Sequence, residues 1–502
     1  MSQMRSLRWL SVGALSVAVV CRADVPVAAW LALTFLLRGS RTLPGGRALG
    51  WLWVALYAAL AGGNRGIIPI GDPVYFLVVA VLATLAALPF AVDRLAAERR
   101  SGIASTLVFP TAWVAMEFLR SRGLPSATFG VLAYTQYGNL PLMQVAAFTG
   151  IWGISFLIAW LAAVVNQAWE QRFAGPAAAR PLLAWAGALG VVLAGGSARL
   201  AWAPEDARPV RAAVVTFPVD MFAPGEVTRI LEGRLSLDEV RRLAPKLDRL
   251  HDWFLEKSEQ EARGGARLVA WPETGLIVFA EDEPAFLARA RRLAAEEGIT
   301  LAMGMGTVHL GADHPTENKV VLLDPAGRIV FAYLKSRPVA GWEASVIRAG
   351  DGRLPFADTA LGRMTAAICF DGDFPDLVRQ IGQAGADLWI LPANDWQAIK
   401  RIHYEMAAFR AIENGTPLLR AASRGVSGAF DPWGRERAAA DHFSGADTMV
   451  AQVPVGGVPT LYAAVGDLFA WLCVAGAAGA MGEALLGRYR LRGEIKAIAS
   501  SA

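Results

Sequence analysis

Long apolar stretches and one region of mixed polarity divide the chain. Residues 7–203 consist largely of Ala, Leu, Val and Trp, whereas 204–456 mix polar and apolar positions. A helix needs about 20 mostly apolar residues to cross a bilayer. The pattern predicts eight membrane spans, at 7–20, 24–37, 48–63, 73–92, 102–119, 142–165, 181–202 and 459–486. The first three are short for a span, and the first two leave open a single re-entrant hairpin.

The mixed region shows short apolar runs that alternate with amphipathic segments. The short apolar runs predict strands at 212–216, 268–271, 300–305, 320–323, 329–333, 364–368, 388–391, 418–421 and 449–453. The helical periods predict helices at 237–263, 284–297, 375–383 and 403–414, and Met303–Gly306 is interpreted as a tight strand end. We therefore expect a membrane bundle at 1–203, an α/β domain at 204–456, and a last span with a tail at 457–502.

Composition and charge agree with this division. The chain is 54% hydrophobic and 18% charged, which is too apolar for an ordinary soluble protein and too charged for a pure membrane bundle. Fourteen basic residues fall on one side of the predicted spans: Arg5, Arg8, Arg38, Arg41, Arg47, Arg94, Arg99, Arg100, Arg172, Arg180, Arg488, Arg490, Arg492 and Lys496. Only Arg22, Arg65, Arg120 and Arg122 lie in the short loops on the other side. The positive-inside rule then predicts cytoplasmic termini and an α/β domain outside. No nucleic-acid signature is present.

The chain has three cysteines, and one of them follows a predicted strand. Cys21 and Cys473 lie in apolar segments, where a thiol behaves as a small hydrophobic group. Cys369 ends the run Ala366–Ile368 and precedes an acidic turn. A thiol is a strong nucleophile only as a thiolate, which requires a base or a cation nearby. Cys369 is therefore a candidate nucleophile, with a buried inert cysteine as the alternative.

A carboxylate and an ammonium also follow predicted strands. Glu273 comes after the strand at 268–271, and Lys335 comes after the run at 329–334. Functional groups of α/β folds gather at strand ends. A desolvated Glu273 could take the thiol proton, and Lys335 could stabilise both the thiolate and an oxyanion. Each residue alone is also compatible with an ordinary surface loop.

Several nearby residues are candidates for shaping a pocket. The set is Trp342, Glu343, Phe370, Asp371, Asn394 and Trp396. Glu343 could orient Lys335 or act as a second acid, and the three aromatic residues could line an entrance. The chain has only five histidines, so a Cys–His pair with His403 is not favoured. No paired CxxC or HExxH occurs, and neither a metal nor a cofactor is expected. In the membrane segments, Glu117 and Asp467 are expected to snorkel to the interface or to form interhelical pairs.

The ordered motifs resemble the carbon–nitrogen hydrolase (nitrilase) superfamily. They are Trp271-Pro272-Glu273, Tyr333-Leu334-Lys335 and Ile368-Cys369. With the membrane segments, the chain resembles the apolipoprotein N-acyltransferase family, as do the blocks Glu117–Arg120, Leu132–Gln136, Arg410–Glu413 and Pro417–Ala421. The resemblance implies an α-β-β-α sandwich joined to eight transmembrane helices. It also implies a multi-pass protein of the bacterial inner membrane whose catalytic domain faces outward.

The resemblance further implies the reaction. An acyl chain would pass from a phospholipid, through a Cys369 thioester, to the N-terminal amine of a diacylglyceryl-cysteine lipoprotein. Glu273 would be the base and Lys335 the oxyanion partner, in a monomer without a cofactor. Phe370-Asp371 replaces the family's Tyr-Glu, and Val339–Trp342 replaces a Pro-Phe-Gly motif. These departures leave open a membrane-tethered amidase or nitrilase with the same triad, and a non-catalytic assembly protein is a third alternative.

Overall fold

The computed structural model describes residues 3–22, 25–97, 100–204, 209–218 and 220–501. The predicted start of the second span at residue 24 and the loop charge Arg99 lie outside these ranges. The chain divides into two compact units. One combines Met1–Ala201 with Asp467–Ala502, and the other is Trp202–Gly466. Each unit has its own secondary structure and is described separately.

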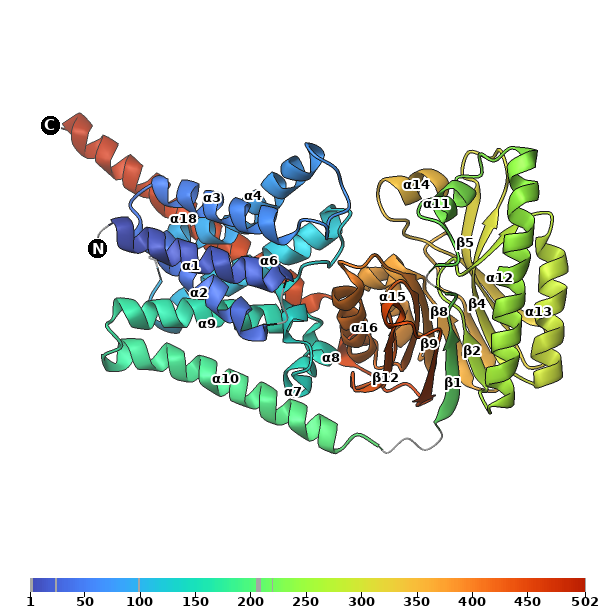
Figure 1. Ribbon diagram of the computed structural model, residues 1–502. Helices are drawn as coiled ribbons and strands as arrows, with labels where there is room; N and C mark the ends of the chain where they lie inside the picture. The colour runs from blue at the N-terminus through green and yellow to red at the C-terminus, as the bar shows by residue number, and fades with distance from the viewer. Residues whose placement is uncertain (1–2, 23–24, 98–99, 205–208, 219, 502) are drawn as a thin grey trace. The chain divides into compact units, whose positions relative to one another are not determined.

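The first unit is helical (Figure 1). Its helices are α1 (Gln3–Arg22), α2 (Pro26–Thr42), α3 (Arg47–Gly63), α4 (Val74–Ala96), α5 (Gly102–Thr106), α6 (Val108–Gly123), α7 (Leu140–Met143), α8 (Ala146–Thr149), α9 (Trp152–Glu170), α10 (Gly175–Ala201) and α18 (Leu468–Ser501), with a 3-10 turn η2 at Leu132–Gln136. Within the described ranges, six helices are long and apolar enough to cross a membrane: α1, α4, the segment Gly102–Gly123, α9, α10 and Leu468–Gly487. The helices α2 and α3, which lie in two other predicted spans, have only 17 residues each, so the predicted count of eight spans stays a prediction. The chain is thus a membrane protein.

Two of the predicted spans are interrupted, and those boundaries were wrong. The range 142–165 contains α7 and α8 before α9 begins at Trp152, and 459–486 contains a short helix, α17 (Leu461–Val465), before α18. Gly150 and Gly466 stand at the breaks with φ of +64° and +65°. Glycine adopts this left-handed backbone at little steric cost, so each residue turns the chain. A hydropathy pattern counts apolar residues and is blind to such turns.

Several charged side chains in the helical unit form hydrogen bonds with other side chains or with the backbone. Asp467 accepts hydrogen bonds from Trp152 Nε1 at 2.8 Å and Arg122 Nη1 at 3.4 Å, which confirms its predicted interhelical pairing. Glu117 instead accepts the backbone N–H of Leu132 at 2.9 Å. Asp93 on α4 receives two bonds from Arg41 on α2, at 2.9 and 2.8 Å. Such pairing makes buried charge tolerable in an apolar bundle.

The second unit contains two β-sheets. The first has the order β13-β1-β2-β4-β5-β6, with β3 also paired to β4, and the second has the order β12-β11-β10-β9-β8-β7. The strands are β1 (Val210–Val215), β2 (Leu268–Ala270), β3 (Leu276–Phe279), β4 (Thr300–Val308), β5 (Thr316–Leu323), β6 (Ile329–Leu334), β7 (Phe356–Thr359), β8 (Gly362–Ala366), β9 (Leu388–Asn394), β10 (Leu418–Ser423), β11 (Val426–Phe430), β12 (Glu436–Asp441) and β13 (Thr448–Val453).

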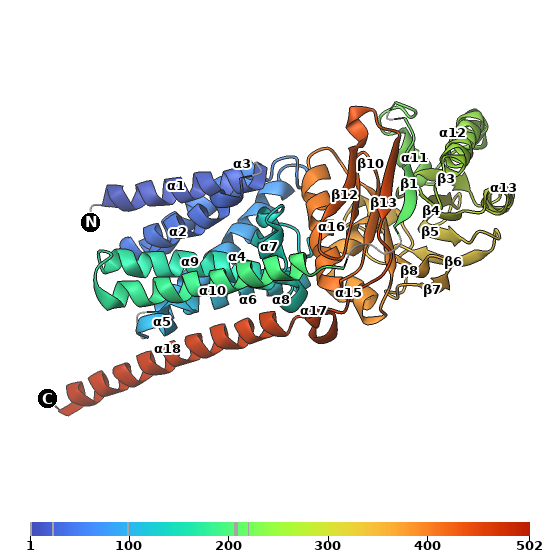
Figure 2. The same ribbon diagram turned by 90° about the horizontal axis from the view of Figure 1, so that it is seen from below.

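Helices cover the outer faces of both sheets (Figures 1 and 2). The helices α12 (Leu237–Arg263) and α13 (Glu283–Glu297) pack on the first sheet, and α16 (Lys400–Asn414) packs on the second beside α15 (Pro375–Gln383). Two short helices, α11 (Glu226–Leu231) and α14 (Trp342–Val346), complete the unit. The predicted α-β-β-α sandwich is therefore confirmed. A capping box between Ser236 and Glu239 fixes the start of α12 at the predicted residue.

Strand directions place the ends of β2 and β6, which Glu273 and Lys335 follow, at one edge of the first sheet. The strands β1, β2 and β4 are parallel, and so are β8, β9 and β10. Since β5 is antiparallel to both β4 and β6, the strand β6 runs in the same direction as β4. Met303–Gly306 lies inside β4, so its interpretation as a strand end was wrong. A Cβ on Gly304 would lie 2.0 Å from the carbonyl oxygen of Pro272, so only glycine lets β4 pass the loop that carries Glu273.

Candidate active site

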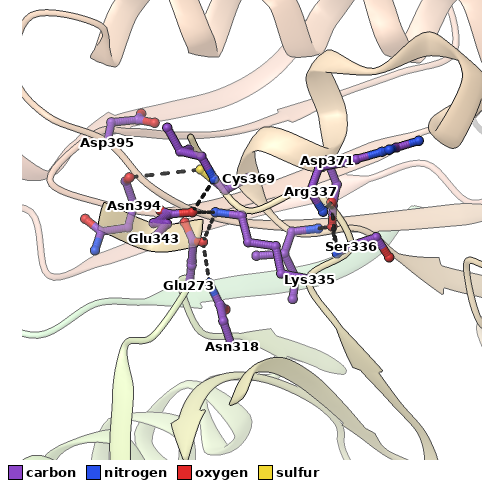
Figure 3. A network of polar contacts seen from close by, with 12 residues as sticks. Glu273, Asn318, Lys335, Ser336, Arg337, Glu343, Cys369, Asp371, Asn394 and Asp395 are labelled. Atoms are coloured by element: carbon purple, nitrogen blue, oxygen red, sulfur yellow. Dashed lines mark hydrogen bonds and ion pairs between the residues drawn. The ribbon is translucent and has the colours of Figure 1, made fainter. Parts of the chain in front are cut away.

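A buried lysine joins two glutamates at this edge (Figure 3). Lys335 Nζ lies 2.7 Å from Glu273 Oε1 and 2.7 Å from Glu343 Oε2. Asn318 on β5 donates from Nδ2 to the same Glu273 oxygen at 2.7 Å. Burial lowers the pKa of Lys335, but the two carboxylates outweigh it and hold that pKa well above its ordinary value. The lysine is therefore a fixed positive charge.

Cys369 begins a 3-10 turn, η3 (Cys369–Asp373), directly after β8. Its φ is +48°, a left-handed conformation that is strained for a residue with a side chain. The side chain is nearly buried, with Sγ 4.0 Å from the carbonyl oxygen of Asn394. Burial and the carboxylate of Glu273 raise the pKa of the thiol well above its usual value, and Lys335 only partly opposes them. The resting thiol is therefore protonated and needs a base.

Glu273 has one oxygen available for that proton. Oε1 accepts from Lys335 and Asn318, whereas Oε2 is buried and has no hydrogen-bond partner among the residues that the structure describes. A buried acceptor without a partner costs about 1–3 kcal/mol, so it marks a place where another group is expected to bind. The site thus combines a buried thiol, a carboxylate oxygen that is able to accept a proton, and a buried ammonium group.

Asp371 connects the nucleophile turn to the end of the lysine strand. Its carboxylate accepts the backbone N–H groups of Ser336 at 3.1 Å, Arg337 at 2.7 Å and Ile368 at 3.1 Å. Tyr333 donates its hydroxyl at 2.8 Å. Burial raises the pKa of Asp371 to about 6, so the group is ionised at neutral pH. It therefore fixes the turn after Cys369 against the residues that follow Lys335.

Replacement of Asp371 by asparagine is expected to loosen this connection. An amide has one acceptor atom, so its NH₂ group would face a backbone N–H that then has no partner. We expect a loss of about 1–3 kcal/mol in stability and slower acyl-enzyme formation. Thermal unfolding of both proteins at neutral pH measures the first effect. An unchanged melting temperature would contradict the assigned role.

The remaining predicted pocket residues make different contacts in the structure. Glu343 contacts Lys335 directly and also accepts the backbone N–H of Val339 at 2.8 Å. Asn394 meets the thiol through its backbone carbonyl. Trp342 is 39% exposed and donates its indole N–H to Glu232 at 3.0 Å. Phe370 packs edge-on against Phe374, and Trp396 is half-buried between β9 and α16. A role of the aromatic residues in an entrance stays a prediction.

The sequence analysis missed one residue near the site and set another aside. Asn318 holds Glu273 by its side chain and accepts the backbone N–H of Lys335 at 2.9 Å, yet no local pattern marks it. His403, which was not favoured, lies beside the thiol: Cys369, Asp395 and His403 each place a ligand-type atom within 4.8 Å of the others. A metal there would displace existing cationic partners, because Asp395 already accepts two bonds from Arg420 and one from His403.

Two family models match the chain, and one of them covers Glu273, Lys335 and Cys369. The family model described as "Carbon-nitrogen hydrolase" matches residues 240–461, and that described as "Apolipoprotein N-acyltransferase N-terminal domain" matches residues 12–164. Both units of the chain are thus similar to domains of carbon–nitrogen hydrolases and apolipoprotein N-acyltransferases.

Named relatives match over most of the chain. The apolipoprotein N-acyltransferase of Geobacter metallireducens is 29% identical over 450 residues, covering 85% of this chain and 82% of the relative. That of Methylococcus capsulatus is 25% identical over 473 residues, covering 89% and 86%. Among solved structures, an amidase from Nesterenkonia sp. is 19% identical with a TM-score of 0.40, covering 52% of this chain and 94% of the amidase.

Proposed function

We propose that the chain transfers an acyl chain from a membrane phospholipid to the N-terminal amine of a diacylglyceryl-cysteine lipoprotein. One observation carries the proposal: a buried Glu–Lys–Cys site occurs in a chain with six helices, within the described ranges, that are apolar enough to cross a membrane. Both substrates carry long acyl chains, so a membrane-bound enzyme meets them where they reside. The names of the relatives favour this function over the amidase alternative.

The first half-reaction would form a thioester. Glu273 Oε2 takes the proton of Cys369, and the thiolate attacks the ester carbonyl of the phospholipid. Lys335 stabilises the oxyanion of the tetrahedral intermediate. The carbon–oxygen bond to glycerol then breaks, and Glu273 returns its proton to the lysophospholipid that leaves.

The second half-reaction would form the amide. The free α-amine of the lipoprotein attacks the thioester, and Glu273 accepts the proton that the amine loses. The carbon–sulfur bond breaks, and the thiolate recovers a proton from Glu273. The cycle needs neither a cofactor nor a metal. Water would compete with the amine for the thioester and would release a fatty acid instead of the amide.

The proposed placement follows from the loop charges. We propose eight spans: the six helices, within the described ranges, that are long and apolar enough to cross a membrane, and the shorter helices α2 and α3. We place both termini in the cytoplasm and the Trp202–Gly466 unit on the outer side of a bacterial inner membrane. The loops on the cytoplasmic side hold 14 Lys or Arg residues and the short outer loops hold four. We propose that the enzyme works as a monomer.

The acceptor distinguishes the transferase from a hydrolase. Purified protein is incubated with phospholipid that carries a labelled acyl chain and with a diacylated lipopeptide that has a free amine. Labelled amide product is expected, and the same lipopeptide with an acetylated amine is expected to remain unlabelled. Release of labelled fatty acid at equal rates with both peptides would overturn the proposal in favour of the hydrolase.

A further inference from the structure

A buried ionic cluster lies next to the nucleophile and has no place in the mechanism above. His403 on α16 contacts Asp395 Oδ1 through Nδ1 at 2.7 Å and Asp373 Oδ1 through Nε2 at 3.2 Å. Arg420 on β10 contacts Asp395 at 2.8 and 3.0 Å. The side chains of all four residues are at most 5% exposed. Because the cluster is almost fully shielded from water, each of its charges acts strongly on the neighbouring groups.

The two carboxylates belong to the two segments that flank the sulfur. Asp373 is the last residue of η3, the turn that Cys369 begins. Asp395 directly follows Asn394, whose carbonyl oxygen faces Sγ at 4.0 Å. His403 thus bridges the nucleophile turn and the end of β9. Because Cys369 has a left-handed backbone, the turn depends on such contacts to hold its conformation.

We infer that His403 is a positioning residue for Cys369: it ties Asp373 to Asp395 and supplies a positive charge beside the thiol in addition to that of Lys335. The charges support this assignment. With His403 protonated, two carboxylates face an imidazolium and a guanidinium, and the cluster is neutral. With His403 neutral, the cluster carries one net negative charge within a few ångströms of a thiol that must become a thiolate.

The protonation state follows from the surroundings. Burial lowers the pKa of His403, but the carboxylates of Asp373 and Asp395 outweigh this effect and raise the pKa to about 9. The other charged or titratable groups that face the ring are Arg420, at 3.2 Å from Nδ1, and Cys369. His403 is therefore charged at neutral pH and loses its proton as the pH rises through about 9. This inference deepens the proposed function and rests on it.

Alkylation of Cys369 by iodoacetamide, followed at the peptide level by mass spectrometry, tests the charge without any acyl transfer. In His403→Gln the positive charge is gone, so the thiol pKa is expected to rise by about one unit and alkylation near pH 7 to slow about tenfold. The difference from the native enzyme should shrink above about pH 9, where native His403 is itself neutral. A purely structural role would not give this pH dependence. Equal rates near pH 7 would overturn the assignment of charge.

A second variant tests the bridge. Asp373→Asn removes one carboxylate, so the cluster carries no net negative charge whether or not His403 keeps its proton, and alkylation is not expected to slow. Acyl-enzyme formation from phospholipid is expected to fall about tenfold because the turn is held less firmly. An unchanged rate of acyl-enzyme formation would overturn the bridge. His251→Gln is the matched control, since His251 is also buried but contacts Ile277 and Phe286 instead. If the native enzyme formed no thioester, the proposed function would fail, and the alkylation result would still decide the role of the charge.

Discussion

Replacement of Cys369 by serine is expected to abolish acyl-enzyme formation and to slow acyl transfer at least about a thousandfold. The oxygen of serine lies in the same nearly buried position, but an alcohol holds its proton far more tightly than a thiol. Glu273 alone then provides too weak a base to generate the nucleophile. Intact-mass spectrometry after exposure to phospholipid detects the missing adduct, and a labelled lipopeptide measures the rate.

The chain contains its own controls for this substitution. Cys21→Ser and Cys473→Ser make the same chemical change in the helical unit, and both are expected to leave the adduct on Cys369 and the rate of transfer intact. Retention of a labelled acyl group at position 369 in the serine variant, with native turnover, would refute the nucleophile assignment.

The parts of the catalytic unit that depend on local pattern were predictable. The bounds of α12 and α15 agree with the sequence prediction, because a capping box and Pro375 mark where these helices begin. Glu273, Lys335 and Cys369 were predicted as site residues because each follows an apolar strand, and the structure brings Glu273 and Lys335 into direct contact. The structure adds that Glu343 shares the lysine with Glu273.

The parts that depend on distant contacts were not predictable. Asp371 binds backbone N–H groups 34 and 35 positions earlier in the chain, and Asn318 reaches Glu273 across 45 positions. His403 lies near the thiol because α16 packs against the nucleophile turn and β10 pairs with β9. No periodicity encodes these pairings. The strands β7 and β12 were also missed, because each lies at a sheet edge and lacks a run of buried residues.

Replacement of Glu273 by glutamine is expected to keep the contact with Lys335 but to remove the group that accepts the proton of Cys369. The amide oxygen can still accept from Lys335 and Asn318, so the fold should persist. The amide nitrogen would replace Oε2, the oxygen without a partner among the described residues, and it cannot accept a proton. Loss of a general base typically costs a factor of about 10²–10⁴, and we expect acyl-enzyme formation to slow by that amount.

Glu283→Gln is the control for this change. Glu283 Oε1 also lies 2.7 Å from a lysine, Lys319, in a largely buried pair, but the lysine that it binds is not Lys335. Its loss should therefore leave the rate within about twofold. Rapid mixing with labelled phospholipid, followed by quenching and mass analysis of the Cys369 peptide, gives the rate of thioester formation in each variant. If Glu273→Gln forms the thioester as fast as Glu283→Gln, some other group deprotonates Cys369, and the free carboxylate oxygen of Glu273 has a purely electrostatic role.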